Sequence, residues 1–251
     1  MHLGDRFAGS RRLPEATTTT SMADDELILL GHLIGDGCTL ARHAVQYTTI
    51  DQENVAAVTS AALHFGVVAR VKQERTWTQV YLPSPTPLTH GQHHPLSQWL
   101  RGLGAWDLRS WEKRIPAQLF SLPPPQIALF LRHLWATDGS VASAVYYATS
   151  SNQLAVGVAE LLLRLDIRTR LRVVRASRGR TQYQVEVSGV DNERRFAEVV
   201  GVHGTRDRQL IERMSAKSTT KGNPNVDSVP SPVWDHVRHK ALPAAGMTAR
   251  Q

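Results

Sequence analysis

Two aspartates close apolar stretches that otherwise have the composition of buried helices. Asp36 ends "LLGHLIGDG" and Asp138 ends "LRHLWATDG". The C-terminus of a helix carries a partial negative charge, so a carboxylate there is unfavourable unless a positive charge lies against it. Each motif therefore predicts a cation, from a side chain or from solution, beside its aspartate.

The two motifs open two similar halves of the chain. The segment "YTTIDQENVAAVTSAALHFGVVARV" from Tyr47 parallels "YATSSNQLAVGVAELLLRLDIRTRL" from Tyr147. Further on, "QVYL" parallels "QVEV", and "KRIPAQLF" from Lys113 parallels "DSVPSPVW" from Asp227. Because the matches occur in the same order in both halves, they indicate an internal duplication.

Periodicity predicts the order αββαββα in each copy. An apolar helix ends at Asp-Gly, where Gly37 or Gly139 is expected to adopt the left-handed conformation that stops a helix. A short hairpin, an amphipathic helix, a second hairpin and a final helix follow. The fold class is therefore α+β, with two pseudo-symmetric repeats. The expected divisions are a connector at 1–23, a first repeat at 24–122, a linker at 123–126, a second repeat at 127–240 and a tail at 241–251.

Basic residues recur on one face of the second predicted hairpin of each copy. Side chains at i, i+2 and i+4 of a strand share a face. Arg168, Arg170 and Arg172 have this spacing, and Arg70 and Lys72 match the last two in the first copy. With a net charge of +7 and a pI of about 10.0, these rows predict a phosphate-rich partner such as DNA. Further candidates for DNA contact lie in the hairpin turns, at Arg75, Arg178 and Arg180.

The composition excludes several other classes of protein. A hydrophobic content of 41% with no long apolar run is typical of a globular protein without membrane spans. The N-terminal residues lack the apolar core of a signal peptide, so a cytoplasmic location is expected. A single cysteine, Cys38, excludes internal disulfides and cysteine-based zinc sites. The "HGQHH" segment offers three histidines, but a solvated loop is the favoured interpretation over a zinc cluster.

With two such motifs in a duplicated αββαββα unit, the chain resembles the LAGLIDADG homing endonucleases, in the two-repeat, single-chain (DOD-type) form carried by inteins. "SWEKRIP" is similar to the lysine-containing block between the motifs, and "NPNVDSVPSPVW" is similar to the closing block of intein endonuclease domains. The inteins of bacterial replicative DNA helicases are the most similar members that we identify. The resemblance extends over about 24–240.

The resemblance implies saddle-shaped DNA-binding sheets and paired motif helices whose aspartates hold Mg²⁺ at the scissile phosphates. Asp36 and Asp138 match those aspartates, and the carbonyls of Gly35 and Thr137 match the backbone metal ligands. Lys113 matches the family's active-site lysine. Magnesium agrees with the helix-end argument, because it binds through one or two carboxylates plus substrate phosphate. The implied function is a Mg²⁺-dependent double-strand break in DNA at a long asymmetric site, made by a monomer with no obligate protein partner.

Two alternative functions remain open. The chain could be a catalytically weak, DNA-binding remnant of an intein, or an RNA maturase on the same fold. A self-splicing intein is disfavoured, because the chain has no N-terminal Cys or Ser nucleophile and no terminal His-Asn. The presence of both motif aspartates favours the endonuclease.

Overall fold

The computed structural model describes residues 13, 16–90, 92–175, 179–222 and 236–244. Contacts divide the chain into two compact units, 11–220 and the two chain ends together (1–10 with 221–251). In the second unit the described elements are a π-helix at Val237–Ala241 and a short helix α9 at Leu242–Ala244. The closing block around Asp227 lies outside the described residues.

The 11–220 unit contains the predicted αββαββα order twice. The first repeat consists of α1 (Asp24–Gly35), β1 (Gly37–Cys38), β2 (Gln46–Thr49), α2 (Gln52–Ala62), β3 (Arg70–Gln73), β4 (Thr78–Tyr81) and α3 (Pro95–Gly102), with 3-10 turns at Leu63–Phe65 and Ala117–Ser121. The second consists of α4 (Pro124–Asp138), β5 (Gly139–Ser140), β6 (Tyr146–Thr149), α5 (Asn152–Arg164), β7 (Thr169–Val174), β8 (Gln182–Val187) and α6 (Val190–Val199).

Each repeat forms its own antiparallel sheet, with the same strand order. The orders are β1-β2-β4-β3 and β5-β6-β8-β7. In the first sheet Tyr47 pairs with Val80, and in the second Tyr147 pairs with Val185; all four side chains are fully buried. These pairs mark the sheet face that packs on the helices. Because side chains alternate along a strand, the neighbouring residues of each strand point to the opposite face.

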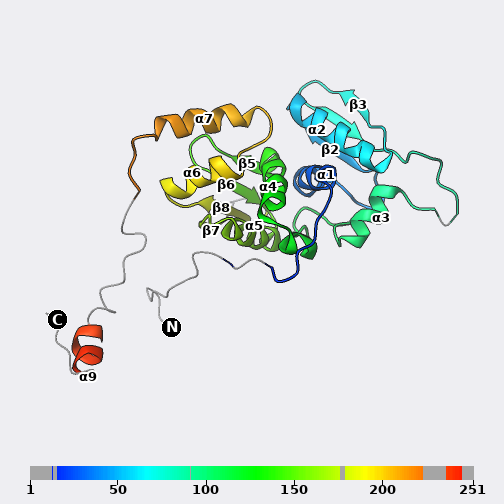
Figure 1. Cartoon of the computed structure of the whole chain (residues 1–251). Helices are drawn as coiled ribbons and strands as arrows, with labels where there is room; N and C mark the ends of the chain where they lie inside the picture. The colour runs from blue at the N-terminus through cyan, green and yellow to red at the C-terminus, as the bar shows by residue number, and fades with distance from the viewer. Residues whose placement is uncertain (1–12, 14–15, 91, 176–178, 223–235, 245–251) are drawn as a thin grey trace. The chain divides into compact units, whose positions relative to one another are not determined.

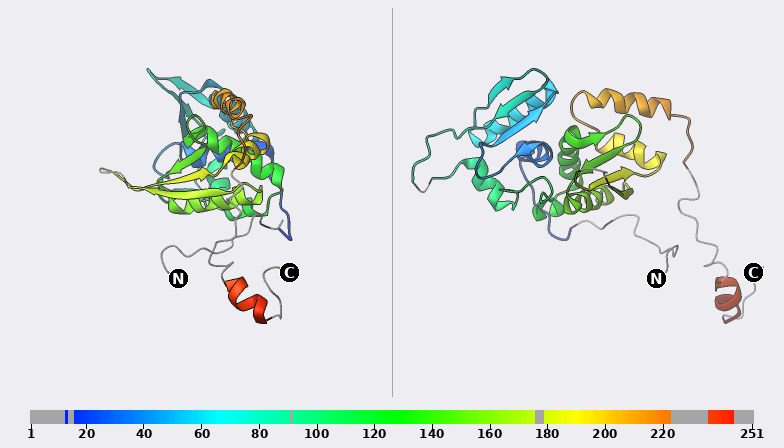
Figure 2. Two further views of the ribbon diagram at one scale, coloured as in Figure 1. Left: turned by 90° about the vertical axis from the view of Figure 1, so that its left-hand side faces the viewer. Right: turned by 180° about the vertical axis from the view of Figure 1, so that it is seen from behind.

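The helices α1 and α4 lie side by side and join the two repeats (Figures 1 and 2). Glycines on α1 meet larger residues on α4. A Cβ added at Gly31 would lie 2.9 Å from the Leu134 nitrogen, and one at Gly35 would lie 2.0 Å from Thr137 Oγ1. The absence of α1 side chains at these two positions therefore lets the backbones approach.

The glycines that follow the two motif aspartates have a different role from the one expected. Gly139 has a φ of −77°, and Gly37 is absent from the glycines with positive φ, so neither stops its helix in a left-handed conformation. Both are required for space instead. A Cβ on Gly37 would lie 2.5 Å from the Leu33 Cα, and one on Gly139 would lie 2.3 Å from the Trp135 carbonyl oxygen.

A further helix that the sequence did not predict, α7 (Arg206–Ala216), follows the second repeat. The buried carboxylate of Glu193 on α6 holds it in place. Arg213 of α7 donates to both oxygens of Glu193, at 3.1 and 2.9 Å, and Lys217 lies 2.7 Å from the same carboxylate. Among the described residues, no helix is both long and apolar enough to span a bilayer.

Candidate functional site

The two motif aspartates lie at the C-terminal ends of the paired helices. Asp36 directly follows α1, and Asp138 is the last residue of α4. Burial, and to a smaller extent the nearby Asp138 carboxylate, raise the pKa of Asp36 to about 6, although the cations Lys113 and Arg206 act in the opposite direction. Burial likewise raises the pKa of Asp138. Since both side chains still reach solvent, the pair presents two crowded carboxylates to an incoming cation.

Lys113 lies against the end of α1. Its Nζ donates to the carbonyl oxygens of Leu33, Gly35 and Gly37, at 3.2, 2.8 and 2.9 Å, and the residue is 9% exposed. These are carbonyls of the kind that a helix C-terminus leaves without partners. Burial lowers the pKa of Lys113 to about 8, while Asp36 and Asp138 favour its charged form. The ammonium therefore lies within the electrostatic reach of both aspartates and also closes the end of the helix.

A second cation at the site was not identified from the sequence. Arg206, the first residue of α7, donates through its guanidinium to the carbonyl oxygen of Ala136, near the end of α4. Its charge lowers the pKa of both Asp36 and Asp138. The sequence offered no signal for this role, because the duplication aligns Lys113 with Asp227 and places no motif around Arg206. Two tertiary contacts bring Arg206 to this position: Glu193 holds α7, and Asp51 holds the preceding Thr205.

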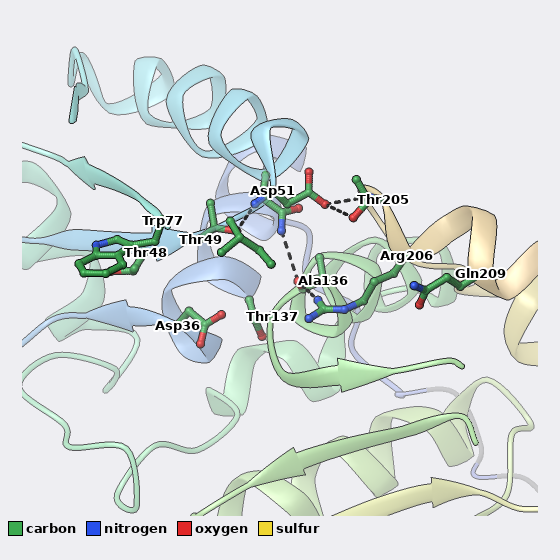
Figure 3. A pocket seen from close by; sticks show the side chains of 12 residues that line it. Asp36, Thr48, Thr49, Asp51, Trp77, Ala136, Thr137, Thr205, Arg206 and Gln209 are labelled. Carbon is green, nitrogen blue, oxygen red and sulfur yellow. Dashed lines mark hydrogen bonds between the residues drawn. The ribbon is translucent and has the colours of Figure 1, made fainter. Parts of the chain in front are cut away.

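A cavity of about 450 Å³ opens beside these residues (Figure 3). Asp36 and Thr137 lie at its base, Arg206 and Gln209 come from α7, and Trp77 comes from the turn between β3 and β4. A second cavity of about 410 Å³ is lined by Asp36, Lys113 and Trp111, among others. Each cavity thus combines Asp36 with basic side chains and a tryptophan, the second including Arg109 as well as Lys113.

Four of the predicted DNA-contacting cations lie on the sheet faces opposite the buried core. Arg70 and Lys72 alternate with Val71, which pairs with buried Val80; Arg170 and Arg172 alternate with Leu171, which pairs with buried Val185. All four are exposed. Two of them already have acidic partners: Lys72 Nζ lies 2.5 Å from Glu74, and Arg172 Nε lies 2.7 Å from Glu186.

The remaining predicted cations are placed differently. Arg168 lies just before β7, where its backbone NH donates to Asn192, so it is not part of that strand. Arg75 is exposed in the turn between β3 and β4. Arg180 stacks on the Trp111 ring, with 3.5 Å between its Cζ and the ring centroid. Arg178 lies outside the described residues.

Three of the histidines that the structure describes have structural roles: His94 caps a helix, and His32 and His133 pack between two helices. His94 caps α3 by accepting from the Leu96 amide at 3.1 Å, and its other ring nitrogen lies 2.8 Å from the Leu82 carbonyl. His32 and His133 are buried between α1 and α4, with 3.1 Å between His32 Nε2 and His133 Nδ1. Across the part of the chain that the structure describes, no group of three or more His, Cys, Asp or Glu residues is placed to hold a metal.

Part of the chain matches a known domain family, and nearly all of it matches replicative DNA helicases. The sequence profile of the LAGLIDADG-like domain matches residues 125–201. The replicative DNA helicase DnaB of Rhodothermus marinus is 45% identical over 99% of this chain, and that of Synechocystis sp. is 38% identical over 100%. The chain covers only 28% and 30% of these relatives, which is less than a third of their length.

Solved structures of the homing endonuclease I-DmoI share the architecture. I-DmoI in complex with DNA and calcium superposes with a TM-score of 0.52, covering 75% of this chain and 97% of that one at 12% identity. A variant of I-DmoI with its target DNA and manganese also gives 0.52, covering 70% and 93% at 13% identity. At this level of identity the likeness concerns the fold. With its two αββαββα repeats joined through the motif helices, the chain has the LAGLIDADG fold.

Proposed function

We propose that this chain is a site-specific, Mg²⁺-dependent DNA endonuclease of the homing type. The observation that carries the proposal is the placement of Asp36 and Asp138 at the ends of two packed helices, with Lys113 at one helix end and Arg206 at the other. Two carboxylates between two cations form a site that can bind a metal and also stabilise charge that develops on phosphate.

The donor set fits Mg²⁺. The two nearby carboxylates repel each other, so a cation bound between them is favourable. A hard divalent ion binds carboxylate and carbonyl oxygen together with substrate phosphate. Asp36, Asp138 and the carbonyls of Gly35 and Thr137 would hold it. The Gly35 carbonyl already accepts from Lys113, but a carbonyl oxygen has a second lone pair. When bound, the metal would lower the pKa of a water and stabilise the leaving oxygen.

The chain's own side chains would orient and stabilise the reacting phosphates. Lys113 and Arg206 would each place a fixed positive charge near one scissile phosphate, where negative charge builds up in the transition state. Outward-facing cations on the sheets would hold the DNA backbone on either side; they are Arg70, Lys72, Arg170 and Arg172, with Arg75, Arg168, Arg178 and Arg180 as further candidates. Phosphate contacts of this kind position the duplex without reading its sequence.

We further propose that the chain is the endonuclease part of an intein. The support is that it matches replicative helicases along nearly its whole length but covers under a third of theirs. This pattern is what a segment inserted into a longer protein produces.

A cleavage assay tests the proposal. The substrate is a plasmid carrying a replicative-helicase gene that lacks this segment, incubated with Mg²⁺ or with a chelator. A single double-strand break that requires Mg²⁺ is expected. The matched control is the same gene interrupted by the segment, which should stay intact because the target is split. Binding to the uninterrupted gene without cleavage would support the DNA-binding remnant instead, and would overturn the endonuclease.

A further inference from the structure

Two hydrogen-bonded contacts join the repeats at positions that the duplication aligns. Asp51 caps the N-terminus of α2, and Ser151 caps that of α5. Asp51 Oδ2 accepts from the amide and the hydroxyl of Thr205, at 2.8 and 2.9 Å. Ser151 Oγ donates to the Lys113 carbonyl oxygen at 2.6 Å. Each cap residue therefore contacts a loop that belongs to the other repeat or follows it.

Each contact is made by a side chain that is already bonded to its own helix. Asp51 Oδ1 accepts from the Glu53 amide at 2.9 Å, and Ser151 Oγ accepts from the Leu154 amide at 3.2 Å. An N-cap residue with satisfied geometry has little freedom to move. The cap therefore gives the opposite loop a rigid point of attachment.

Both loops lead directly to a cation of the site. Thr205 immediately precedes Arg206, whose guanidinium bonds to the Ala136 carbonyl at the end of α4. The loop approaches Asp51 closely at Gly204, which has a φ of 84° and where a Cβ would lie 2.4 Å from Asp51 Oδ2. On the other side Ser151 bonds to Lys113 itself, whose ammonium bonds to the carbonyls of Gly35 and Gly37.

We propose that Asp51 and Ser151 are positioning residues that act across the repeats: Asp51 of the first repeat sets Arg206 at the end of α4, and Ser151 of the second sets Lys113 at the end of α1. The inference rests on the proposed function. It predicts that each half-site depends on a helix cap in the other repeat, so that neither repeat completes a half-site alone.

The consequence is a strand-specific defect. A small displacement of a catalytic group can cost on the order of a hundredfold in rate. If Arg206 and Lys113 serve different scissile phosphates, loss of one cap slows one strand and spares the other. A general loss of stability would slow both strands together.

The test uses the full chain and a duplex labelled differently on its two strands. Asp51→Ser keeps one oxygen for the α2 cap but lacks the far oxygen that reaches Thr205. Ser151→Ala removes the bond to Lys113, and Ser151→Thr restores the hydroxyl. Arg206→Gln and Lys113→Met serve as references for each half-site. Thr59→Ala, which removes a hydroxyl bonded only within α2, is the matched control.

We expect Asp51→Ser to slow cleavage of one strand by at least about tenfold, and this should be the strand that Arg206→Gln leaves uncut. Ser151→Ala should slow cleavage of the other strand, as Lys113→Met does. Ser151→Thr should restore both strands, and Thr59→Ala should cut as the wild type does. Equal slowing of both strands by either cap variant, or no slowing, overturns the inference while leaving the endonuclease intact. A wild type that cuts neither strand overturns the proposed function.

A second readout does not need cleavage. Amide hydrogen exchange should show lost protection at Thr205 in Asp51→Ser, because that amide donates to Asp51, and unchanged protection there in Ser151→Ala. Protection at Thr205 that survives Asp51→Ser would overturn the Asp51 contact.

Discussion

Asp36 and Asp138 occupy positions at which a helix disfavours a carboxylate, and the structure supplies each end with a compensating cation. Lys113 bonds to carbonyls at the end of α1 and Arg206 bonds to one near the end of α4. The two cations are non-equivalent: a lysine in the segment after α3 and an arginine at the start of α7. The half-sites are thus alike in charge although the sequence aligns Lys113 with an aspartate.

For the individual aspartates, we predict that Asp36→Asn and Asp138→Asn each abolish double-strand cleavage, because asparagine lacks the charge that would hold Mg²⁺. DNA binding should persist, since the sheet cations supply it. The free energy of unfolding should hold or rise by up to about 1 kcal/mol, because a carboxylate leaves an unfavourable helix end. Cleavage assays and denaturant titrations measure the two effects.

The pH dependence of this stabilisation follows from the raised pKa of Asp36. In the folded protein the Asp36 carboxyl keeps its proton up to about pH 6. In the unfolded chain it loses this proton near the ordinary pKa of an aspartate, which is lower. Stability therefore falls as pH rises through this window, and the gain from Asp36→Asn should be present above pH 6 and vanish in acid. Asp24→Asn, at the opposite end of α1, is the control and should be neutral or slightly destabilising. Full cleavage of DNA by Asp36→Asn or Asp138→Asn would contradict the proposal that these aspartates hold the metal.

Among the elements, the α1–α4 interface contains a buried polar chain. Tyr47 OH lies 3.1 Å from His32 Nδ1, and His32 Nε2 lies 3.1 Å from His133 Nδ1. In the His32–His133 bond one nitrogen donates and the other accepts, so the bond is lost if both rings become protonated. Burial, His203 and Arg132 lower the pKa of His133 to about 3.

The chain should therefore lose stability in mild acid. Burial lowers the pKa of His32 as well. Below about pH 6.5 the histidines of the unfolded chain therefore bind protons that His32 and His133 do not bind in the folded protein, which costs about 1.4 kcal/mol per pH unit for each histidine. His133→Gln removes one of these groups and can keep the hydrogen bond to His32. Thermal unfolding between pH 7 and 5 should show a shallower decline for this variant. The exposed His43→Gln should follow the wild type; a wild-type slope in His133→Gln would refute the linkage.

The outer face of the second sheet carries its own prediction. Glu186 pairs with Arg172 on the face proposed for DNA. Glu186→Gln removes a negative charge and frees Arg172, so DNA affinity should rise by about two- to fivefold, with a steeper dependence on salt. Fluorescence anisotropy across a salt series measures both. Glu160→Gln on α5 is the control, and weaker binding by Glu186→Gln would place the DNA elsewhere.

At the scale of the whole molecule, two repeats in one chain supply the symmetry that many proteins obtain by dimerising. The α1–α4 contact, the two cap contacts and the paired aspartates all lie between the repeats, so the site exists only where the repeats meet. The divisions near 24, 122, 126 and 240 remain predictions, and part of the second repeat's predicted end lies outside the described residues.

We accordingly predict a monomer. Sedimentation at micromolar concentration should give the mass of one 27.8 kDa chain, with or without a target duplex, because both half-sites are already present. An obligate dimer in the absence of DNA would contradict this prediction, since it would require a second interface for which the duplication has no need.

The sequence by itself determined the repeated αββαββα order and the two helix-end aspartates. Both follow from local rules: hydrophobic periodicity specifies helices and strands, and a carboxylate after an apolar helix is recognisable without any partner. The alternation of Arg70 with Lys72, and of Arg170 with Arg172, likewise determined their shared sheet face, because the strand period is two residues.

Only the tertiary structure decided how the site is completed. Gly37 and Gly139 suggested left-handed helix ends, but close packing against Leu33 and Trp135 is what requires them. The duplication pointed to Asp227 as the counterpart of Lys113, whereas Arg206 is the cation found near the end of α4. Its position depends on Glu193 holding α7 and on Asp51 holding Thr205. Such contacts join residues far apart in the chain, and no local pattern of hydrophobicity or charge encodes which of them meet.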